Sequence, residues 1–590
     1  MTDTQNPNRA EVAFKVRVSA AELARARGSP AHLSNNSESR FRNPDGTRSL
    51  LANFTKGLPH IKETALVESA IDYDRFVRAI DSGDPRDFAD LPLGPQGVEP
   101  RFTSGIASDP EVGTRAWESG GAGLVFDLEG PDAQAVTMPP APELDSDELV
   151  AEVTECYWMS LLRDVPFPTF ESNSHIQAAA ESINNTQWIK FKNNPPAHLT
   201  AAERSRLRGP VTTANVFRGI TPGDEVGPYL SQFLLVGTTG IANGNEVGDG
   251  FIQYGGMRMD QRVRVAKPHI DYMTTFGAYL DVQNAANVSG RELYKEEEPR
   301  FRFIHTPRDL ATYVHFDALY QAYLNACIIL LDIGAPFDSG IPFQLDNDID
   351  KQQGFATFGG PHILSLVTEV ATRALKAVRF QKFNVHRRLR PEAIGARVDR
   401  YCATKAPEFA GAAKLSEALD KELLQKVHDH NKKQNLLSDR GNPRANDFNP
   451  DGEVSEGNLL MPMAFPEGSP MHPAYGAGHA TVAGACVTVL KAFFDGGYRL
   501  PFCYITDEDG TGLQAVEIDE PLTVDGELNK ICSNISIGRN WAGVHYFTDY
   551  IESIRIGEEI AIGILQEQKL TFSENFSMTL NKFDGSTIRI

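Results

Sequence analysis

The sequence contains no closely spaced pair of cysteines. Its six cysteines are widely scattered, at Cys156, Cys327, Cys402, Cys486, Cys503 and Cys532. The absence of a C-x-x-C motif argues against a zinc ribbon and against a dithiol redox centre. Cys327 and Cys486 lie on apolar helical stripes, where reduced core cysteines are expected. For Cys402 and Cys503 the sequence leaves both a free thiol and a disulfide, within or between chains, as alternatives.

Long apolar runs are also missing. The longest aliphatic run, residues 328–331, is far shorter than the roughly 20 residues that cross a bilayer. Residues 1–20 are polar and lack the apolar segment of a secretion signal. We therefore expect a soluble protein without a membrane partner, cytoplasmic by default.

Positive charge is scarce. The chain has 57 Lys and Arg residues against 78 Asp and Glu residues, which gives a formal net charge of −21. Such a balance argues against a nucleic-acid partner and against binding to anionic membranes. A local cluster of basic side chains is informative against this acidic background.

Helical patterns dominate the chain, and the predicted strands are short and few. Residues 1–140 are rich in Pro, Gly, Asn, Asp and Ser, and we expect a loop-rich N-terminal arm that packs on the core and on neighbouring subunits. Residues 141–360 and 361–590 are predicted to form two helical halves, of which the second carries the functional site. A chain of 590 residues exceeds the size that one simple core supports.

The longest helical signal covers residues 308–331. One apolar stripe runs along it, and Asp317 interrupts that stripe. A carboxylate on an apolar face is costly to bury unless it is paired. Two interpretations stay open: Asp317 reaches water at the edge of the stripe, or it orients a histidine.

A second group of acids lies in the loop of residues 334–360. Asp346, Asp348 and Asp350 alternate with other residues, and Phe343 and Gln352 could add oxygen ligands. Alternating carboxylates in a loop can bind calcium. No glutamate closes a twelve-residue calcium loop, so a solvated acidic loop is the alternative.

The basic cluster that stands out against the acidic background is residues 379–390. It holds five basic side chains and one histidine, with Pro391 immediately after it. Apolar residues are interleaved with the charges, which is unlike a solvated charge run, and the segment is too short for a nucleic-acid patch. We interpret it as an anion cradle in which Arg379, Lys382 and Arg390 are the main candidates.

A second candidate anion site lies at residues 469–480. This stretch combines His472 and His479 with two prolines and five Gly or Ala residues, and an apolar helical pattern follows it. The free N–H groups at the start of a helix attract anions. We therefore expect an anion at Gly478 with histidines beside it.

The third piece is residues 537–549, in which Arg539 precedes His545 by six positions and Asp549 follows four later. Taken in order, the three pieces resemble the signature shared by vanadium-dependent haloperoxidases and type 2 phosphatidic-acid-phosphatase-like enzymes. The surrounding sequence is similar to that of the bromoperoxidases of red algae and their cyanobacterial relatives. The similar segments include residues 315–320, 378–391 and 542–547. That likeness extends over nearly the whole chain.

The resemblance implies a mainly α fold with two four-helix bundles per subunit, long loops and few strands. It also implies a vanadate cofactor with His545 as the axial ligand of vanadium. The residues expected to hold vanadate are Lys382, Arg390, Gly478, His479, Arg539 and His545. His479 would act as acid–base partner, because its proton moves near neutral pH.

The other expected roles rest on the same resemblance. Asp317 would orient His479, while His472 and Arg379 would tune the halide and peroxide at the pocket mouth. For His472, a helix-entry histidine bonded to the backbone is the alternative. The family implies oxidation of bromide, with chloride or iodide as further halides, by hydrogen peroxide. The products halogenate small organic nucleophiles, and family members form homo-oligomers, of twelve subunits in algae.

Two positions depart from the shared signature. Ala477 replaces a serine that would donate a hydrogen bond to the anion, and Gly538 replaces the serine that phosphatases place before the arginine. The first predicts weaker anion stabilisation or altered halide selectivity. Two rival functions remain: an acid phosphatase that forms a phosphohistidine at His545, and an oxyanion-storing shell protein.

Overall fold

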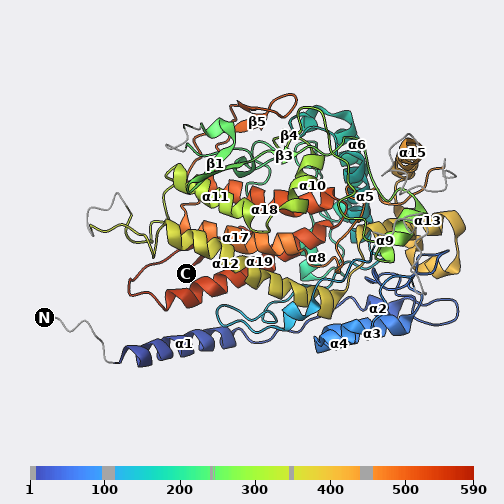
Figure 1. The fold of residues 1–590 in the computed structure, drawn as a ribbon, viewed down its shortest axis with the longest axis horizontal. Helices are drawn as coiled ribbons and strands as arrows, with labels where there is room; N and C mark the ends of the chain where they lie inside the picture. Colours follow the sequence, from blue (N-terminus) through green and yellow to red (C-terminus); the bar gives the residue numbers. More distant parts are fainter. Residues whose placement is uncertain (1–7, 96–112, 240–243, 245, 345–350, 439–455) are drawn as a thin grey trace.

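The computed structural model describes residues 8–95, 113–239, 244, 246–344, 351–438 and 456–590. Helices make up 47% of the structure and strands 8%. The mainly α prediction is confirmed. In Figure 1 the long helices lie across the body, and β1, β3, β4 and β5 lie along its upper edge.

The helices divide into an N-terminal set and a C-terminal set. Before residue 340 they are α1 (Arg9–Ala26), α2 (Ser37–Arg40), α3 (Ala70–Ser82), α4 (Pro85–Ala89), α5 (Asp147–Leu161), α6 (Ser174–Asn184), α7 (Gln187–Lys190), α8 (Ala201–Arg206), α9 (Phe276–Gln283), α10 (Pro307–Phe316) and α11 (Gln321–Asp332). After it they are α12 (Gly360–Phe380), α13 (Pro391–Thr404), α14 (Ala413–Ala418), α15 (Lys421–Ser438), α17 (Gly478–Phe493), α18 (Val524–Trp541) and α19 (Phe547–Lys569).

The strands form two-stranded antiparallel hairpins or ribbons. They are β1 (Phe251–Tyr254) with β2 (Met257–Asp260), β3 (Val263–Arg264) with β4 (Phe301–Arg302), β5 (Tyr504–Thr506) with β6 (Leu513–Ala515), and β7 (Thr579–Asn581) with β8 (Thr587–Arg589). Two strand residues, Ile252 of β1 and Leu580 of β7, are buried in the main core.

The core of the C-terminal half is built around α17, which packs against α12, α18 and α19. Two glycines allow α17 and α19 to approach closely. A Cβ atom on Gly484 would lie 2.2 Å from the carbonyl oxygen of Ile554, and one on Gly557 would lie 2.1 Å from that of Thr481. Any side chain at either position would therefore push the two helices apart, and α17 carries the start of the candidate site.

The single helix predicted over residues 308–331 is wrong. The structure has two helices there, α10 and α11, whose axes differ by 101°. Asp317 ends α10 in an extended conformation, with φ −62° and ψ 147°. Its carboxylate bonds to a histidine on α17 instead of lying on a continuous apolar face. Asp317 thus marks the break between α10 and α11, and its side chain contacts a segment distant in the sequence.

The N-terminal segment contains helices as well as long loops. Residues of α3 and its neighbours form a small second core around Tyr73, Phe76 and Ile80, and Phe383 from the C-terminal half completes it. In contrast, α1 has no buried residue. Figure 1 shows α1 extending along the edge of the body, next to the end of α19.

Within the described residues, no single helix is long and apolar enough to cross a membrane, and the bent pair α10–α11 meets that test only when both helices are taken together. All six cysteines are free thiols. Cys327 and Cys486 are buried as predicted, and no disulfide joins Cys402 to Cys503.

Candidate active site

The basic stretch folds as the end of one helix and the start of another. After α12, the chain makes a π-helical turn over Gln381–His386, and α13 begins at Pro391. A proline suits the first helical position because it needs no N–H donor there. Lys382 lies on the π turn and Arg390 caps α13, and both side chains are almost completely buried.

Lys382 and Arg390 are charged groups held by neutral partners. The Lys382 ammonium donates to the carbonyl oxygens of Pro473 at 2.9 Å and Ala474 at 3.3 Å. Burial, reinforced by nearby Arg390, holds the pKa of Lys382 well below its usual value. Burial also lowers the pKa of Arg390 to about 10. In both cases burial outweighs the opposing effect of nearby carboxylates, so the charged forms of Lys382 and Arg390 are incompletely compensated.

Arg390 connects two of the predicted histidines. Its Nη1 lies 3.0 Å from Nε2 of His545, and its Nη2 lies 2.8 Å from Nδ1 of His472. It also donates to the carbonyl oxygens of His472 and Val544. An arginine has no acceptor atom, so both ring nitrogens that face it must be unprotonated acceptors.

His545 lies in the turn between α18 and α19. Its Nδ1 is 2.7 Å from Oδ2 of Asp549, which is an acceptor, so Nδ1 carries the proton and Nε2 carries the lone pair. Burial and the charge of Arg390 hold the pKa of His545 well below its usual value. The ring is therefore neutral at pH 7, and Nε2 carries the lone pair a ligand atom needs, to which Arg390 donates in this structure.

Arg539 approaches the same place from α18. Its Nη1 donates to the carbonyl oxygen of Val314 at 2.9 Å, while its buried Nε has no hydrogen-bond partner within the described residues. Burial lowers the pKa of Arg539. The glycine before it is closely packed, since a Cβ on Gly538 would lie 3.0 Å from a Val314 methyl group.

The start of α17 supplies the third predicted piece. Gly478 is the first helical residue and Ala477 is the N-cap, without a side-chain cap. His479 follows, and its Nε2 lies 2.9 Å from Oδ1 of Asp317. Nε2 therefore carries the ring proton and donates a hydrogen bond to the carboxylate. Nδ1 of His479 then carries the lone pair and is available to accept a proton. Asp317 does not reach water as an edge residue would, since its side chain is only 3% exposed.

The sequence did not indicate Glu118. This N-terminal residue contacts Nε2 of His472 at 3.2 Å with one carboxylate oxygen and pairs with Arg379 through the other. Burial opposes its charge, but the hydrogen bond from His472 and the positive charge of Arg379 outweigh that effect and hold the pKa of Glu118 well below its usual range. Burial and nearby Lys382 keep His472 neutral by lowering its pKa. His472 thus donates from Nε2 to Glu118 and accepts from Arg390 at Nδ1.

The combined geometry is that of an anion site. Lys382, Arg390 and Arg539 are buried cations, and within the described parts of the chain none of the three has a carboxylate within ion-pair distance. The nearest candidates are engaged elsewhere: Glu392 binds Lys56, and Asp549 binds Arg388. An uncompensated buried charge is strongly unfavourable, so the cluster is arranged for an anionic ligand.

The calcium prediction is not resolved by the structure. Asp346, Asp348 and Asp350 lie outside the described residues. Phe343 and Gln352 are described, and the Phe343 ring packs against Phe358 with 5.9 Å between ring centroids. A search of the described positions finds no group of three or more His, Cys, Asp or Glu side chains arranged to hold a metal ion.

Known proteins share both the sequence and the fold. The vanadium-dependent bromoperoxidase of Corallina officinalis is 50% identical over 610 residues, covering 99% of this chain and 98% of the relative. That of Corallina pilulifera is 49% identical over 99% of this chain and 98% of its own length. The Ascophyllum nodosum enzyme is 31% identical over 100% of this chain and 94% of its own length.

Two further comparisons agree. Residues 439–573 match the family model of the second helical-bundle domain of vanadium chloroperoxidase (VCPO). The solved structure of a second vanadate-dependent bromoperoxidase from A. nodosum superposes with a TM-score of 0.80, at 26% identity over 100% of this chain and 92% of that one. The chain belongs to the vanadium-dependent bromoperoxidase family.

Proposed function

We propose that the buried cluster of Lys382, Arg390 and Arg539 holds vanadate, and that the protein uses it to oxidise bromide with hydrogen peroxide. The observation that carries this proposal is the set of three buried cations without a carboxylate partner among the described residues. Membership of the bromoperoxidase family supplies the chemistry. Neither the phosphatase nor the storage alternative is supported by these relatives.

The residues present fit vanadate. Two guanidinium groups and an ammonium group match an anion with charge spread over several oxygens. The buried Nε of Arg539 has an unused donor, and the first N–H groups of α17, including that of Gly478, have no partner within the helix. His545 offers a neutral Nε2 whose orientation is fixed by Asp549. Ligating histidines are commonly oriented by a carboxylate in this way.

The chain's own groups then perform the proton chemistry. When bound, vanadium(V) supplies Lewis acidity without a change in its oxidation state. We assign His479 as the acid–base group, because Asp317 holds its Nε2 proton and leaves Nδ1 to accept and release a proton. His472 and Arg379 would shape the approach of bromide and hydrogen peroxide, and small organic nucleophiles would receive the oxidised bromine.

Glu118 places a negative charge next to this anion site. Replacing it in the variant Glu118→Gln is expected to tighten vanadate binding and to lower the KM for bromide, each by roughly fivefold, because about 1 kcal/mol of repulsion is removed. The amide can still accept the proton of His472. Equilibrium dialysis of the metal-free protein with vanadate measures the vanadate affinity. Kinetics of the loaded protein at varied bromide measure the KM.

A matched control for this prediction is Glu38→Gln. Glu38 is another N-terminal carboxylate, and it pairs with Arg387 in the same basic stretch. The variant Glu38→Gln should leave the vanadate affinity and the KM for bromide unchanged. Weaker vanadate binding in Glu118→Gln would contradict the repulsion account and would show that Glu118 acts chiefly by holding Arg379 in place.

We further propose that the protein forms a homo-oligomer. The solved relative from A. nodosum is homohexameric, and α1 of this chain exposes Phe14 (64%) and Val12 (41%) on a helix with no buried residue. Light scattering of the full chain distinguishes six copies from twelve. Removal of residues 1–28 is expected to yield smaller assemblies, whereas a monomeric full chain would rule out the proposal.

Calcium binding near residues 343–352 is a separate proposal that rests on the alternation of Asp346, Asp348 and Asp350 in the sequence. Elemental analysis after dialysis tests this proposal. The calcium content of the unchanged protein is compared with that of the variant Asp348→Asn. Equal calcium content near zero in both proteins would exclude a bound ion.

A further inference from the structure

A buried ion pair between the N-terminal segment and the C-terminal half lies next to the anion site. Nζ of Lys56 is 2.8 Å from Oε1 of Glu392, and the two side chains are 2% and 0% exposed. Glu392 belongs to the first turn of α13, two positions after Arg390. The pair thus connects a lysine that belongs to none of the three pieces of the site with the helix that Arg390 caps.

Glu392 is the carboxylate that acts most strongly on Arg390. Burial lowers the pKa of Arg390, and Glu392 opposes that shift more than Asp549 or Glu118 does. Yet Oε1 of Glu392 accepts from Lys56, and its Oε2 accepts from the backbone N–H of Ser469 at 2.8 Å. Both carboxylate oxygens are therefore engaged with partners other than Arg390.

Lys56 is held in place by three acceptors. Besides Glu392, its ammonium group donates to the carbonyl oxygens of Glu467 at 3.1 Å and of Ser469 at 2.6 Å. A lysine has three N–H donors, so each of them has an acceptor. Burial lowers the pKa of Lys56 to about 8, and Glu392 opposes that shift, so the ammonium group is charged at neutral pH. Lys56 therefore brings a positive charge to Glu392 and keeps no donor for a ligand of its own.

The charge of Glu392 decides what the loss of Lys56 would do. Arg390 is the other cation that acts on the Glu392 carboxylate. An uncompensated buried charge is strongly unfavourable, so without Lys56 the carboxylate would depend on Arg390 as its counter-charge. Arg390 would then offer less positive charge to an anion, and the carboxylate itself would repel that anion.

We propose that Lys56 neutralises Glu392 and thereby reserves the charge of Arg390 for vanadate. Lys56 is a positioning residue, because it acts through Glu392 and Arg390 and does not itself face the anion. The inference deepens the proposed function and rests on it, since vanadate is the anion concerned. It also makes the N-terminal segment part of the electrostatics of the site, with Glu118 adding negative charge there and Lys56 cancelling it.

Two substitutions that break the same ion pair test the proposal. Lys56→Gln leaves the charge of Glu392 uncompensated, and we expect it to weaken vanadate binding by about tenfold. Glu392→Gln removes that charge, so this variant should bind vanadate at least as tightly as the unchanged protein. The double variant Lys56→Gln/Glu392→Gln should recover the affinity of the unchanged protein. Equilibrium dialysis of the metal-free proteins with vanadate measures all four affinities.

A role limited to holding the backbone predicts a different pattern. Lys56 and Glu392 both bind residues 467–469, which lead to His472. If these contacts were all that mattered, both single variants would bind vanadate more weakly and the double variant would not recover. The two accounts therefore differ in the direction of the effect of Glu392→Gln.

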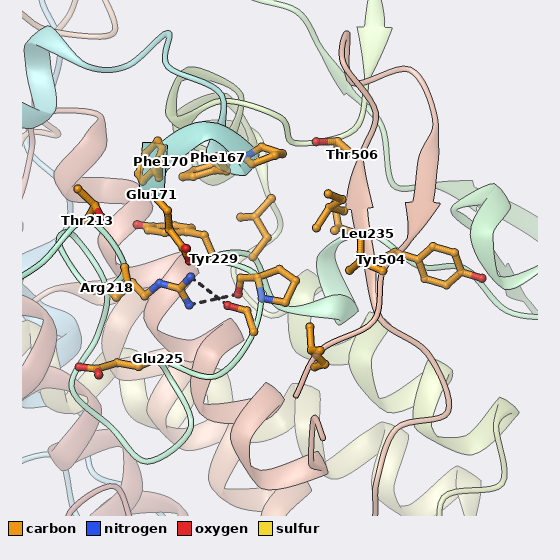
Figure 2. Close-up of a pocket in the computed structure, with 18 of the residues that line it drawn as sticks. Phe167, Phe170, Glu171, Thr213, Arg218, Glu225, Tyr229, Leu235, Tyr504 and Thr506 are labelled. Atoms are coloured by element: carbon orange, nitrogen blue, oxygen red, sulfur yellow. Dashed lines mark hydrogen bonds between the residues drawn. The ribbon is translucent and has the colours of Figure 1, made fainter. Parts of the chain in front are cut away.

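Arg218 provides a matched control at the cavity of about 410 Å³ shown in Figure 2. It is also a buried cation, 8% exposed, and it holds a loop by donating to the backbone carbonyl oxygens of Asp224 and Gly227. None of the residues that line this cavity belongs to the proposed vanadate site. Arg218→Gln should therefore leave the vanadate affinity unchanged. A loss equal to that of Lys56→Gln would show that removing any buried loop anchor disturbs the site, and it would overturn the charge account.

Weaker vanadate binding in both single variants would overturn the proposal, as would a double variant as weak as Lys56→Gln. If the unpaired carboxylate keeps Lys56→Gln from folding, the double variant decides: an affinity equal to that of the unchanged protein supports the proposal, and a weaker one contradicts it. Failure of the proposed function has a different signature. The unchanged protein and Arg218→Gln would then bind no vanadate either, and the inference would fall with the function.

Discussion

The variant His545→Ala is expected to lose its ability to retain vanadium. The unprotonated Nε2 of His545 is the ligand atom offered to the metal, and Asp549 fixes its orientation from 2.7 Å. Loss of a carboxylate that orients a ligand typically weakens metal binding by about 10–100-fold. Removal of the ligand itself should therefore weaken it by more than about 100-fold, as measured by vanadium content after gel filtration.

His386 provides a matched control for this variant. It is also buried in the basic stretch, but its ring packs against Tyr475 and neither nitrogen has a hydrogen-bond partner in the described part of the chain. The variant His386→Phe should retain vanadium. Unchanged retention in His545→Ala would show that another residue would supply the ligand to vanadium.

The variant Ala477→Ser is expected to bind vanadate about tenfold more tightly, since a hydrogen bond to a charged group contributes about 1.5–3 kcal/mol and part of that is offset by desolvation. Ala477 is the uncapped N-cap of α17 and is only 1% exposed. A serine oxygen there can accept from an N–H of the first helical turn while its proton is donated to the anion.

The same change should stabilise the metal-free protein by about 1 kcal/mol through helix capping. Thermal unfolding without vanadate and equilibrium dialysis with vanadate separate the two effects. Ala477→Cys is the control. The cysteine side chain has the same shape as that of serine, but its S–H group is only a weak hydrogen-bond donor. An equal gain in affinity from cysteine and serine would contradict the hydrogen-bond account.

Much of the site could be predicted because its pieces are local in sequence. Lys382 and Arg390 stand in one basic stretch, Gly478 and His479 open one helix, and Arg539 and His545 lie six positions apart. Local rules for helix starts and anion binding apply to each piece separately. The structure then brings Arg390 to 3.0 Å from His545, although 155 positions separate them.

The parts that could not be predicted depend on contacts between distant segments. The pattern over 308–331 suits one helix, but the bond from Asp317 to His479 favours a break that no local periodicity reveals. Glu118 reaches His472 and Arg379 from a segment with no motif around it. A lone glutamate in a Gly-rich loop looks like any solvated acid.

Titration of the metal-free protein with orthovanadate tests the central claim most directly. Bromination of a phenol dye by bromide and hydrogen peroxide is followed at each step, with and without competing phosphate. We predict that activity rises until one vanadate is bound per chain and that phosphate shifts the titration to higher vanadate. Full vanadate binding without bromination, together with hydrolysis of a phosphate monoester by the metal-free protein, would contradict the account.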